Sequence, residues 1–202
     1  MKNFITLALA LCMALSASVC AYAAEIDTDG GSGSTPVYLS STEDGTMEGE
    51  PSATAMSVTV PTALPMAMSQ TGDVTTADNC QIINNSYGAV RVKSVTISAE
   101  NGWRLTAFGD KSTLASEKVD SNQLGFAICI GDGEWTVTDS SNESAQALIS
   151  APIDGCYMSG AGNTSGNTVS VDYSAIVTPL SAPVTNANIA NVVFVIEWDT
   201  AA

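Results

Sequence analysis

The region from Met56 onward consists of short runs rich in Val, Ile and Thr, which Gly, Asn, Asp and Pro interrupt at brief intervals. Such runs, bounded by turn-forming residues, predict β-strands. We expect strands at 57–60, 64–68, 73–76, 81–84, 89–99, 103–108, 124–130, 135–138, 146–151, 168–173, 175–180 and 189–198. A weak signal at 114–119 is the one helical pattern in this region. The sequence therefore predicts an all-β fold, a single antiparallel β-sandwich or jelly-roll-like domain.

Two of the predicted strands have patterns that indicate their surroundings. In 89–99 the apolar positions change phase between Val92 and Val95, which indicates a β-bulge or a strand that changes sheets. The run from Ile189 to Trp198 is almost entirely apolar, as in a strand covered on both faces. We therefore expect this last run to lie at the centre of a sheet.

Composition divides the chain into three segments. Residues 1–23 have a basic start at Lys2, a short apolar run and small residues before Ala23, a pattern typical of a secretory signal peptide cleaved after that residue. The apolar run is too short to span a membrane. Residues 24–55 form an acidic leader, and residues 56–202 form the β-sandwich domain. We expect a protein that is secreted and associated with the cell surface.

The segment 24–55 contains seven acidic residues, no basic residue and few large apolar ones. It buries too little apolar surface to offset the entropy of ordering, so we expect a disordered leader. Asp27 and Asp29 have the D-x-D spacing of a calcium loop, but the EF-hand continuation and its closing Glu are missing. A solvated tail is therefore favoured over a metal site.

Net charge and the lack of histidine exclude several classes of function. The chain has 6 basic and 21 acidic residues and a formal net charge of −15. This balance argues against binding to nucleic acid or anionic lipid, because Lys and Arg supply most of the affinity for polyanions. Without histidine there is no Ser-His-Asp or Cys-His nucleophile and no His-ligated zinc. We expect neither a cofactor nor a metal.

A catalytic site would then have to rely on carboxylates, and two pairs are near enough in sequence to consider. Asp132 and Glu134 precede Trp135, and Glu197 lies close to Asp199. The first pair fits the tip of a hairpin equally well, and the second fits the exposed end of a strand. Because proximity in sequence is their only support, we expect no catalytic residues and a non-enzymatic protein.

Covalent cross-links are left open by the sequence. Without the signal peptide the cysteines are Cys80, Cys129 and Cys156, an odd number that cannot form a closed disulfide framework. A single bridge between Cys129 and Cys156 with Cys80 free, and no bridge at all, both fit. Lys93 and Asn191 lie in predicted strands and could form an isopeptide bond, the alternative being a solvent-facing Lys93.

Several strings occur in an order found in a known family. A W-x-L element stands at Trp103 and Leu105, within Asn-Gly-Trp-Arg-Leu-Thr-Ala. The other landmarks are V-T-V-P-T-x-L-P at 58–65, I-x-N-N-S at 82–86 and V-V-F-x-I-x-W at 192–198. Over 56–198 the chain resembles small secreted surface proteins of Firmicutes of the WxL-domain type. It departs from the family at the second motif, where Trp198-Asp199-Thr200 replaces W-x-L.

The resemblance implies a β-rich module that holds non-covalently to the cell wall, with peptidoglycan as ligand. Trp103, Leu105 and Trp198 are then the candidate ligand-binding residues; the alternative makes both tryptophans core anchors. We expect a secreted, non-catalytic cell-envelope protein, a wall-associated structural or binding module whose partners are cell-wall glycan or other surface proteins. The alternative is an extracellular matrix or fibre subunit that self-associates by strand exchange, with 56–64 as the better donor strand. A remote alternative is a carboxylate-dependent glycan hydrolase.

Overall fold

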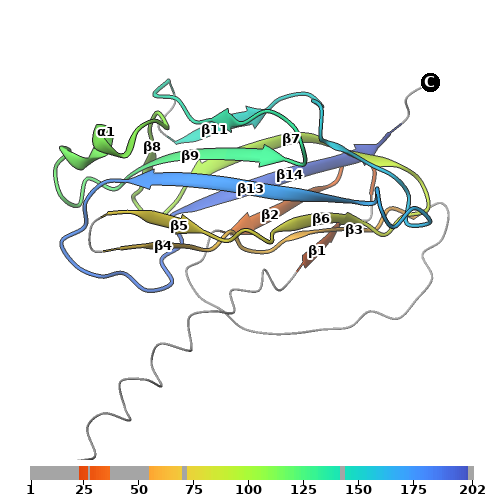
Figure 1. Cartoon of the computed structure of the whole chain (residues 1–202), viewed down its shortest axis with the longest axis horizontal. Helices are drawn as coiled ribbons and strands as arrows, with labels where there is room; N and C mark the ends of the chain where they lie inside the picture. The colour runs from red at the N-terminus through yellow and green to blue at the C-terminus, as the bar shows by residue number, and fades with distance from the viewer. Residues whose placement is uncertain (1–22, 27, 37–54, 70–71, 142–143, 200–202) are drawn as a thin grey trace, which may run out of the picture.

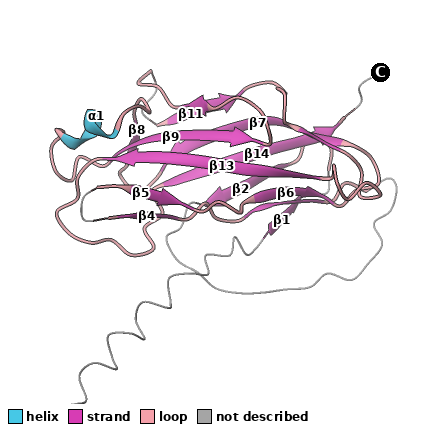
Figure 2. Ribbon diagram, in the orientation of Figure 1, coloured by secondary structure: helices cyan, strands magenta, loops and turns pink. Residues whose placement is uncertain are grey.

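The protein is a sandwich of two β-sheets. The computed structural model describes residues 23–26, 28–36, 55–69, 72–141 and 144–199. Figure 1 shows the two sheets packed face to face, and Figure 2 shows strands throughout with one short helix. The prediction of an all-β, sandwich-like single domain is confirmed.

The described residues form fourteen β-strands and one short helix. They are β1 (Ala23–Ile26), β2 (Ser32–Pro36), β3 (Val58–Pro61), β4 (Met66–Met68), β5 (Val74–Thr76), β6 (Gln81–Asn84), β7 (Val90–Ala99), β8 (Arg104–Leu105), α1 (Lys111–Ala115), β9 (Gln123–Ile130), β10 (Thr136–Val137), β11 (Ala145–Ile149), β12 (Tyr157–Met158), β13 (Thr168–Val177) and β14 (Ala190–Trp198). The two runs expected at 168–173 and 175–180 form one strand, β13.

The pairing of the strands defines a larger and a smaller sheet. The larger sheet has the order β1-β3-β6-β13-β9-β10, with β8 beside β9, and the smaller has the order β11-β7-β14-β2, with β12 beside β7. A separate hairpin consists of β4 and β5. Within the described residues every pairing is antiparallel except that of β8 with β9. The run 189–198 therefore forms an interior strand, β14, as its apolar pattern predicts.

Alternate residues of the long strands build the core between the sheets. Val192, Phe194 and Ile196 of β14 are fully buried, and so are Phe126 and Ile128 of β9 in the other sheet. Successive side chains of a strand point to opposite faces, so each strand contributes every second residue to this core. Each such side chain stabilises the fold by about 1.5 to 3 kcal/mol when it leaves water.

The change of phase in β7 is a β-bulge, which confirms one of the two predicted explanations. Ser94 pairs with Val195 and Val92 pairs with Ile196, so the register shifts at Lys93. The extra residue lets Lys93 face solvent while Val92 and Val95 both remain buried. Without the bulge a strict alternation would place one of these valines in water.

The β4–β5 hairpin is attached to the larger sheet by one buried tyrosine. The Tyr173 hydroxyl donates a hydrogen bond to the carbonyl oxygen of Pro65 and accepts one from the backbone N–H of Ala77 at 3.1 Å. Burial raises the pKa of Tyr173 to about 12, although the N–H of Ala77 opposes the shift. The neutral hydroxyl thus fixes both ends of the hairpin.

Part of the segment predicted to be a disordered leader is ordered in the sandwich. β1 pairs with β3 at an edge of the larger sheet, and β2 pairs with β14 at an edge of the smaller sheet. The prediction failed for 24–26 and 32–36 because backbone pairing with a sheet edge needs no apolar side chains. Residues 27 and 37–54 lie outside the described residues, as do residues 1–22 of the predicted signal peptide.

The segment expected to act as a donor strand is instead built into the larger sheet. β3 lies between β1 and β6, and Met56, Val58, Val60 and Leu64 are buried in the core. Four buried apolar side chains hold this segment in its own fold. Donation of 56–64 to another copy stays a prediction.

The structure also corrects two cross-links considered from the sequence. Cys129 and Cys156 are free thiols, whereas Cys80 is disulfide-bonded, so the combination of a Cys129–Cys156 bridge with a free Cys80 is wrong. Lys93 Nζ lies 2.9 Å from a carboxylate oxygen of Glu197, whereas Asn191 pairs with Ser98 farther along β7. The two groups are too far apart along the strands for an isopeptide bond.

Candidate functional site

The three candidate residues of the W-x-L elements do not form one surface. Trp198 pairs with Val90 at the start of β7, whereas Trp103 follows the end of that ten-residue strand. A strand of this length spans about 33 Å, so the two tryptophans lie at opposite ends of the sandwich. Leu105 is 1% exposed and belongs to the core. Trp103 and Trp198 are both partly buried and packed against the core.

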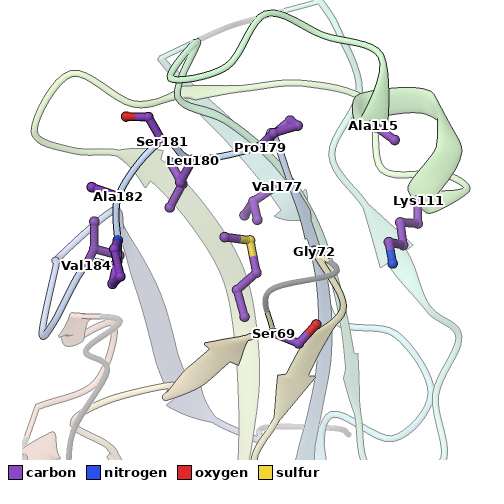
Figure 3. Close-up of a pocket in the computed structure, with 12 residues that line it drawn as sticks. Ser69, Gly72, Lys111, Ala115, Val177, Pro179, Leu180, Ser181, Ala182 and Val184 are labelled. Atoms are coloured by element: carbon purple, nitrogen blue, oxygen red, sulfur yellow. The ribbon is translucent and has the colours of Figure 1, made fainter.

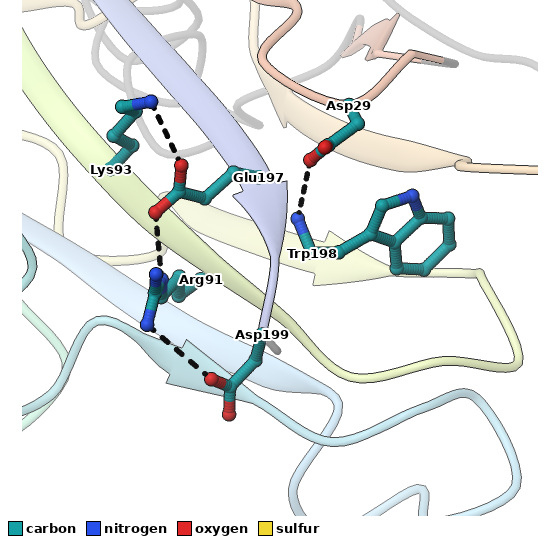
Figure 4. A network of polar contacts seen from close by, with 6 residues as sticks. All are labelled: Asp29, Arg91, Lys93, Glu197, Trp198 and Asp199. Carbon is teal, nitrogen blue, oxygen red and sulfur yellow. Dashed lines mark hydrogen bonds and ion pairs between the residues drawn. The ribbon is translucent and has the colours of Figure 1, made fainter. Parts of the chain in front are cut away.

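Trp198 is held in place by its backbone and by its ring. The backbone N–H of Trp198 donates a hydrogen bond of 2.9 Å to a carboxylate oxygen of Asp29, as Figure 4 shows. The N–H of Asp199 donates to the carbonyl oxygen of Ala89 at 2.9 Å. The indole covers Gly88, where there is no side chain. The ring is therefore fixed in one position at the end of the smaller sheet.

Next to Trp198, two cations and two carboxylates form an ion-pair network (Figure 4). Arg91 Nε lies 2.8 Å and Lys93 Nζ 2.9 Å from the two carboxylate oxygens of Glu197, and a second nitrogen of Arg91 lies 3.5 Å from Asp199. The hydrogen bond from Lys93, followed by that from Arg91, holds the pKa of Glu197 below its usual value. A carboxylate that stays ionised in this way is unsuited to act as a general acid.

The second carboxylate pair considered from the sequence lies in a turn. Residues 131–133 pack on the turn that contains Asp154 and Gly155, where a Cβ at Gly133 would stand 2.3 Å from the carbonyl oxygen of Asp154. Cys129 Sγ donates a hydrogen bond to the carbonyl oxygen of Gly133 at 3.1 Å. Asp132 and Glu134 are thus solvent-facing residues of a closely packed turn.

Exposed aromatic side chains gather at the same end of the sandwich as Trp198. The large apolar side chains that are exposed in the described part of the chain are Tyr87 (50%), Val119 (46%), Trp135 (52%), Val137 (49%), Tyr157 (45%) and Val184 (45%). Tyr87 follows β6, Trp135 follows β9 and Tyr157 begins β12. β12 pairs with the start of β7, and the register places the ends of β6 and β9 at this end too. We call Tyr87, Trp135, Tyr157 and Trp198 the aromatic end.

Hydrogen bonds join the loops of the aromatic end to one another. The buried side-chain amide of Asn84 donates to the carbonyl oxygens of Gly88 and Ser159, each at 2.8 Å. The N–H of Ala161 donates to the carbonyl oxygen of Ser86 at 2.7 Å. These bonds connect the loop carrying Tyr87 to the loop that follows Tyr157, so the aromatic side chains are displayed from a fixed base.

The opposite end of the sandwich has an open pocket of about 550 Å³ between the β4–β5 hairpin, α1 and the loop after β13 (Figure 3). Its walls include Met68, Val177 and Leu180, with Lys111 at the rim. Lys111 forms an ion pair with Asp73. None of the residues singled out from the sequence lines this pocket.

Trp198 was among the candidates chosen from the sequence, whereas Tyr87 and Tyr157 were not. Tyr87 follows Asn-Asn-Ser and precedes Gly88, a turn composition that could have indicated exposure. Tyr157 gives no such signal, because it begins a two-residue strand that pairs with a distant part of the chain.

No protein-family model, curated protein or solved structure matches the chain. Within the described residues no group of His, Cys, Asp and Glu is placed to hold a metal ion, and no helix is long and apolar enough to cross a bilayer. Within the described residues the chain is a β-sandwich with three half-exposed aromatic side chains and the partly buried Trp198 at one end.

Proposed function

We propose that this protein is a secreted, non-catalytic module of the bacterial cell envelope that associates with cell-wall glycan through the aromatic end. The observation that carries the proposal is the position of the exposed aromatic side chains. Tyr87, Trp135 and Tyr157 are each about half exposed, and all three lie at one end of the sandwich. Large exposed aromatic groups collected in one region are typical of a binding surface.

The chemistry of the aromatic end suits sugars. An aromatic ring offers a flat apolar face to the C–H groups of a pyranose, while the Tyr hydroxyl and Trp N–H can bind its hydroxyl groups. The surrounding loops are rich in Asn, Ser and Gly, which provide adaptable hydrogen-bonding groups. Arg91 and Lys93, the cations nearest Trp198, are both engaged by Glu197. This arrangement favours an uncharged glycan over a polyanion.

The resemblance to WxL-domain proteins supports the cell wall as the source of that glycan. Trp198, which stands at the second motif, belongs to the aromatic end, whereas Trp103 of the first motif lies at the far end. We therefore assign the first W-x-L element a structural role, with Leu105 in the core. Of the three residues expected to bind ligand, only Trp198 stays in the proposed surface.

Cosedimentation with purified peptidoglycan sacculi tests the proposal. The mature protein is expected to sediment with the sacculi, and the variant Y87A/W135A/Y157A is expected to lose at least about tenfold in affinity, or about 1.4 kcal/mol. The matched control is V119A/V184A, which removes two equally exposed side chains away from the aromatic end. Failure of the mature protein to sediment, or equal loss in both variants, would contradict the proposal.

A further inference from the structure

We propose that residues 24–36, which we call the arm, are exchanged between two copies of this chain. This exchange is independent of glycan binding and makes the arm an interaction segment whose partner is a second copy. The arm forms an edge strand in each of the two sheets. The fold of one copy is therefore completed at two edges by a single short segment.

The bonds that hold the arm are mostly backbone hydrogen bonds. β2 pairs with β14 from Ser32 opposite Val195 to Pro36 opposite Asn191. The connecting turn extends the pairing: the N–H of Gly30 donates to the carbonyl oxygen of Ile196 at 3.1 Å, and the N–H of Ile196 donates to that of Gly31 at 3.0 Å. These bonds would form identically with the arm of another copy.

The sequence of β2, Ser-Gly-Ser-Thr-Pro, contains no large apolar side chain. Its detachment therefore removes little apolar surface from the core, in contrast to β3, whose Val58 and Val60 are fully buried. Elements with few buried apolar groups open at a lower free energy than the whole domain. β2 is thus an element that can leave while the core stays folded.

The edge of β14 that β2 covers would be prone to pair with another strand if β2 left it. β14 supplies Val192, Phe194 and Ile196 to the core, and its outer side carries Val193 and Val195. Without β2 it becomes a long apolar edge strand with unpaired N–H and C=O groups, which is a template for another strand. The strand known to fit the register of this edge is β2. A second copy of the chain also carries β2, so a second copy is the occupant that we infer.

The chain between the arm and β3 permits the exchange. Residues 37–57 separate Pro36 from Val58, and an extended chain of that length reaches about 70 Å. A covalent tether of this length gives the arm an effective concentration of about 1 mM at its own edge. Pairing of the arm with another copy competes with pairing to its own edge when the protein concentration is also about 1 mM. The two arrangements contain the same hydrogen bonds, so neither is favoured by its contacts.

Cysteine cross-linking between differently substituted full-length mature chains tests the proposal. Ser34 lies opposite Val193, so a disulfide between the variants S34C and V193C in a mixture can form only when the arm of one copy pairs with the other copy. The control mixture pairs S34C with A147C, because Ala147 is exposed on β11 at the far edge of the same sheet. The native cysteines of the mature chain, Cys80, Cys129 and Cys156, are all buried and do not compete.

We expect the S34C and V193C mixture, held at about 1 mM and then oxidised, to give at least about fivefold more covalent heterodimer than the control. Light scattering on the unsubstituted protein at the same concentration should show dimers or larger species. The double variant S34C/V193C should cross-link within monomers, which shows that these two positions can form a disulfide. If it does so and both mixtures still give equal heterodimer yields, the proposal is overturned. A purely monomeric mass at about 1 mM would overturn it as well.

Discussion

Gly88 and Trp198 are in such close contact that a Cβ atom at position 88 would stand 2.8 Å from Trp198 Cζ3. No real Cβ makes so short a contact, so the position admits only glycine unless the indole moves. The turn at 84–88 and the end of β14 are thereby fitted to each other. This contact links the loop that carries Tyr87 to the strand that ends at Trp198.

The variant G88A is expected to destabilise the protein by about 1 to 3 kcal/mol, because the added methyl group displaces the indole. Urea unfolding measures the change, and the fluorescence of Trp198 should shift as its ring becomes more exposed. G109A is the matched control, since a Cβ there meets only the Thr113 hydroxyl at 3.7 Å. A stability for G88A equal to that of G109A would contradict the contact.

The variant E197Q is expected to lose about 1 kcal/mol at pH 7, because it breaks the ion pairs with Arg91 and Lys93. The folded state lowers the pKa of Glu197 from 4.5, so this stabilisation is present above pH 4.5 and disappears as the pH falls through the lower folded value. The difference between the two proteins should therefore shrink in acid. Urea unfolding from pH 7 to pH 3 measures it. E134Q, at an exposed turn residue, is the control and should change stability by less than about 0.5 kcal/mol at pH 7.

The variant Y173F is expected to cost about 1 to 3 kcal/mol at neutral pH, because it leaves the carbonyl of Pro65 and the N–H of Ala77 without the hydroxyl. The pKa of Tyr173 is raised from 10 to about 12, so its neutral form contributes stability that is complete below pH 10 and is lost as the pH rises toward 12. By that pH the unsubstituted protein should lose about 2 to 3 kcal/mol that Y173F does not lose.

Alkaline unfolding curves of both proteins test this expectation. Y157F serves as the control, because Tyr157 is 45% exposed and its substitution should change stability by less than about 0.5 kcal/mol. Parallel loss of stability in the unsubstituted protein and Y173F would show that Tyr173 does not carry the effect.

Cys129 and Cys156 are expected to resist thiol reagents in the native protein. Burial raises the pKa of both thiols, and the carboxylates of Asp172 and Asp132 raise that of Cys129 further. Because the thiolate is the reactive form, labelling at pH 8 should be at least about 100-fold slower than in denaturant. The exposed thiol of A147C gives the reference rate. Native labelling of either cysteine at that rate would contradict the burial.

Much of the sandwich can be predicted because its strands alternate between core and solvent. β6 was predicted at its observed bounds, and β7, β9 and β14 within one residue at each end. The bulge at Lys93 was visible as a change of phase. These features are local, since burial on one face of a strand fixes the spacing of its apolar residues.

The arm and the aromatic end could not be predicted in the same way. β1 and β2 were missed because strands that pair through the backbone alone have no apolar signature, and β2 is Ser-Gly-Ser-Thr-Pro. Trp103 and Trp198 were grouped because their strings look alike, whereas sheet register places them at opposite ends. The relative positions of distant segments depend on pairing over long sequence separations, which a local pattern does not encode.

The pairing of β2 with β14 has a consequence for how the chain folds. It joins Pro36 to Asn191 and Ser32 to Val195, so the interior strand of the smaller sheet acquires its second neighbour from the far part of the sequence. Contacts with such long sequence separation form slowly, because the entropy of closing the loop is lost before the contact is gained. During folding, β14 should therefore pair with β7 first and wait for β2. Until β2 arrives, β14 keeps an unpaired edge, and such an edge is a template for aggregation.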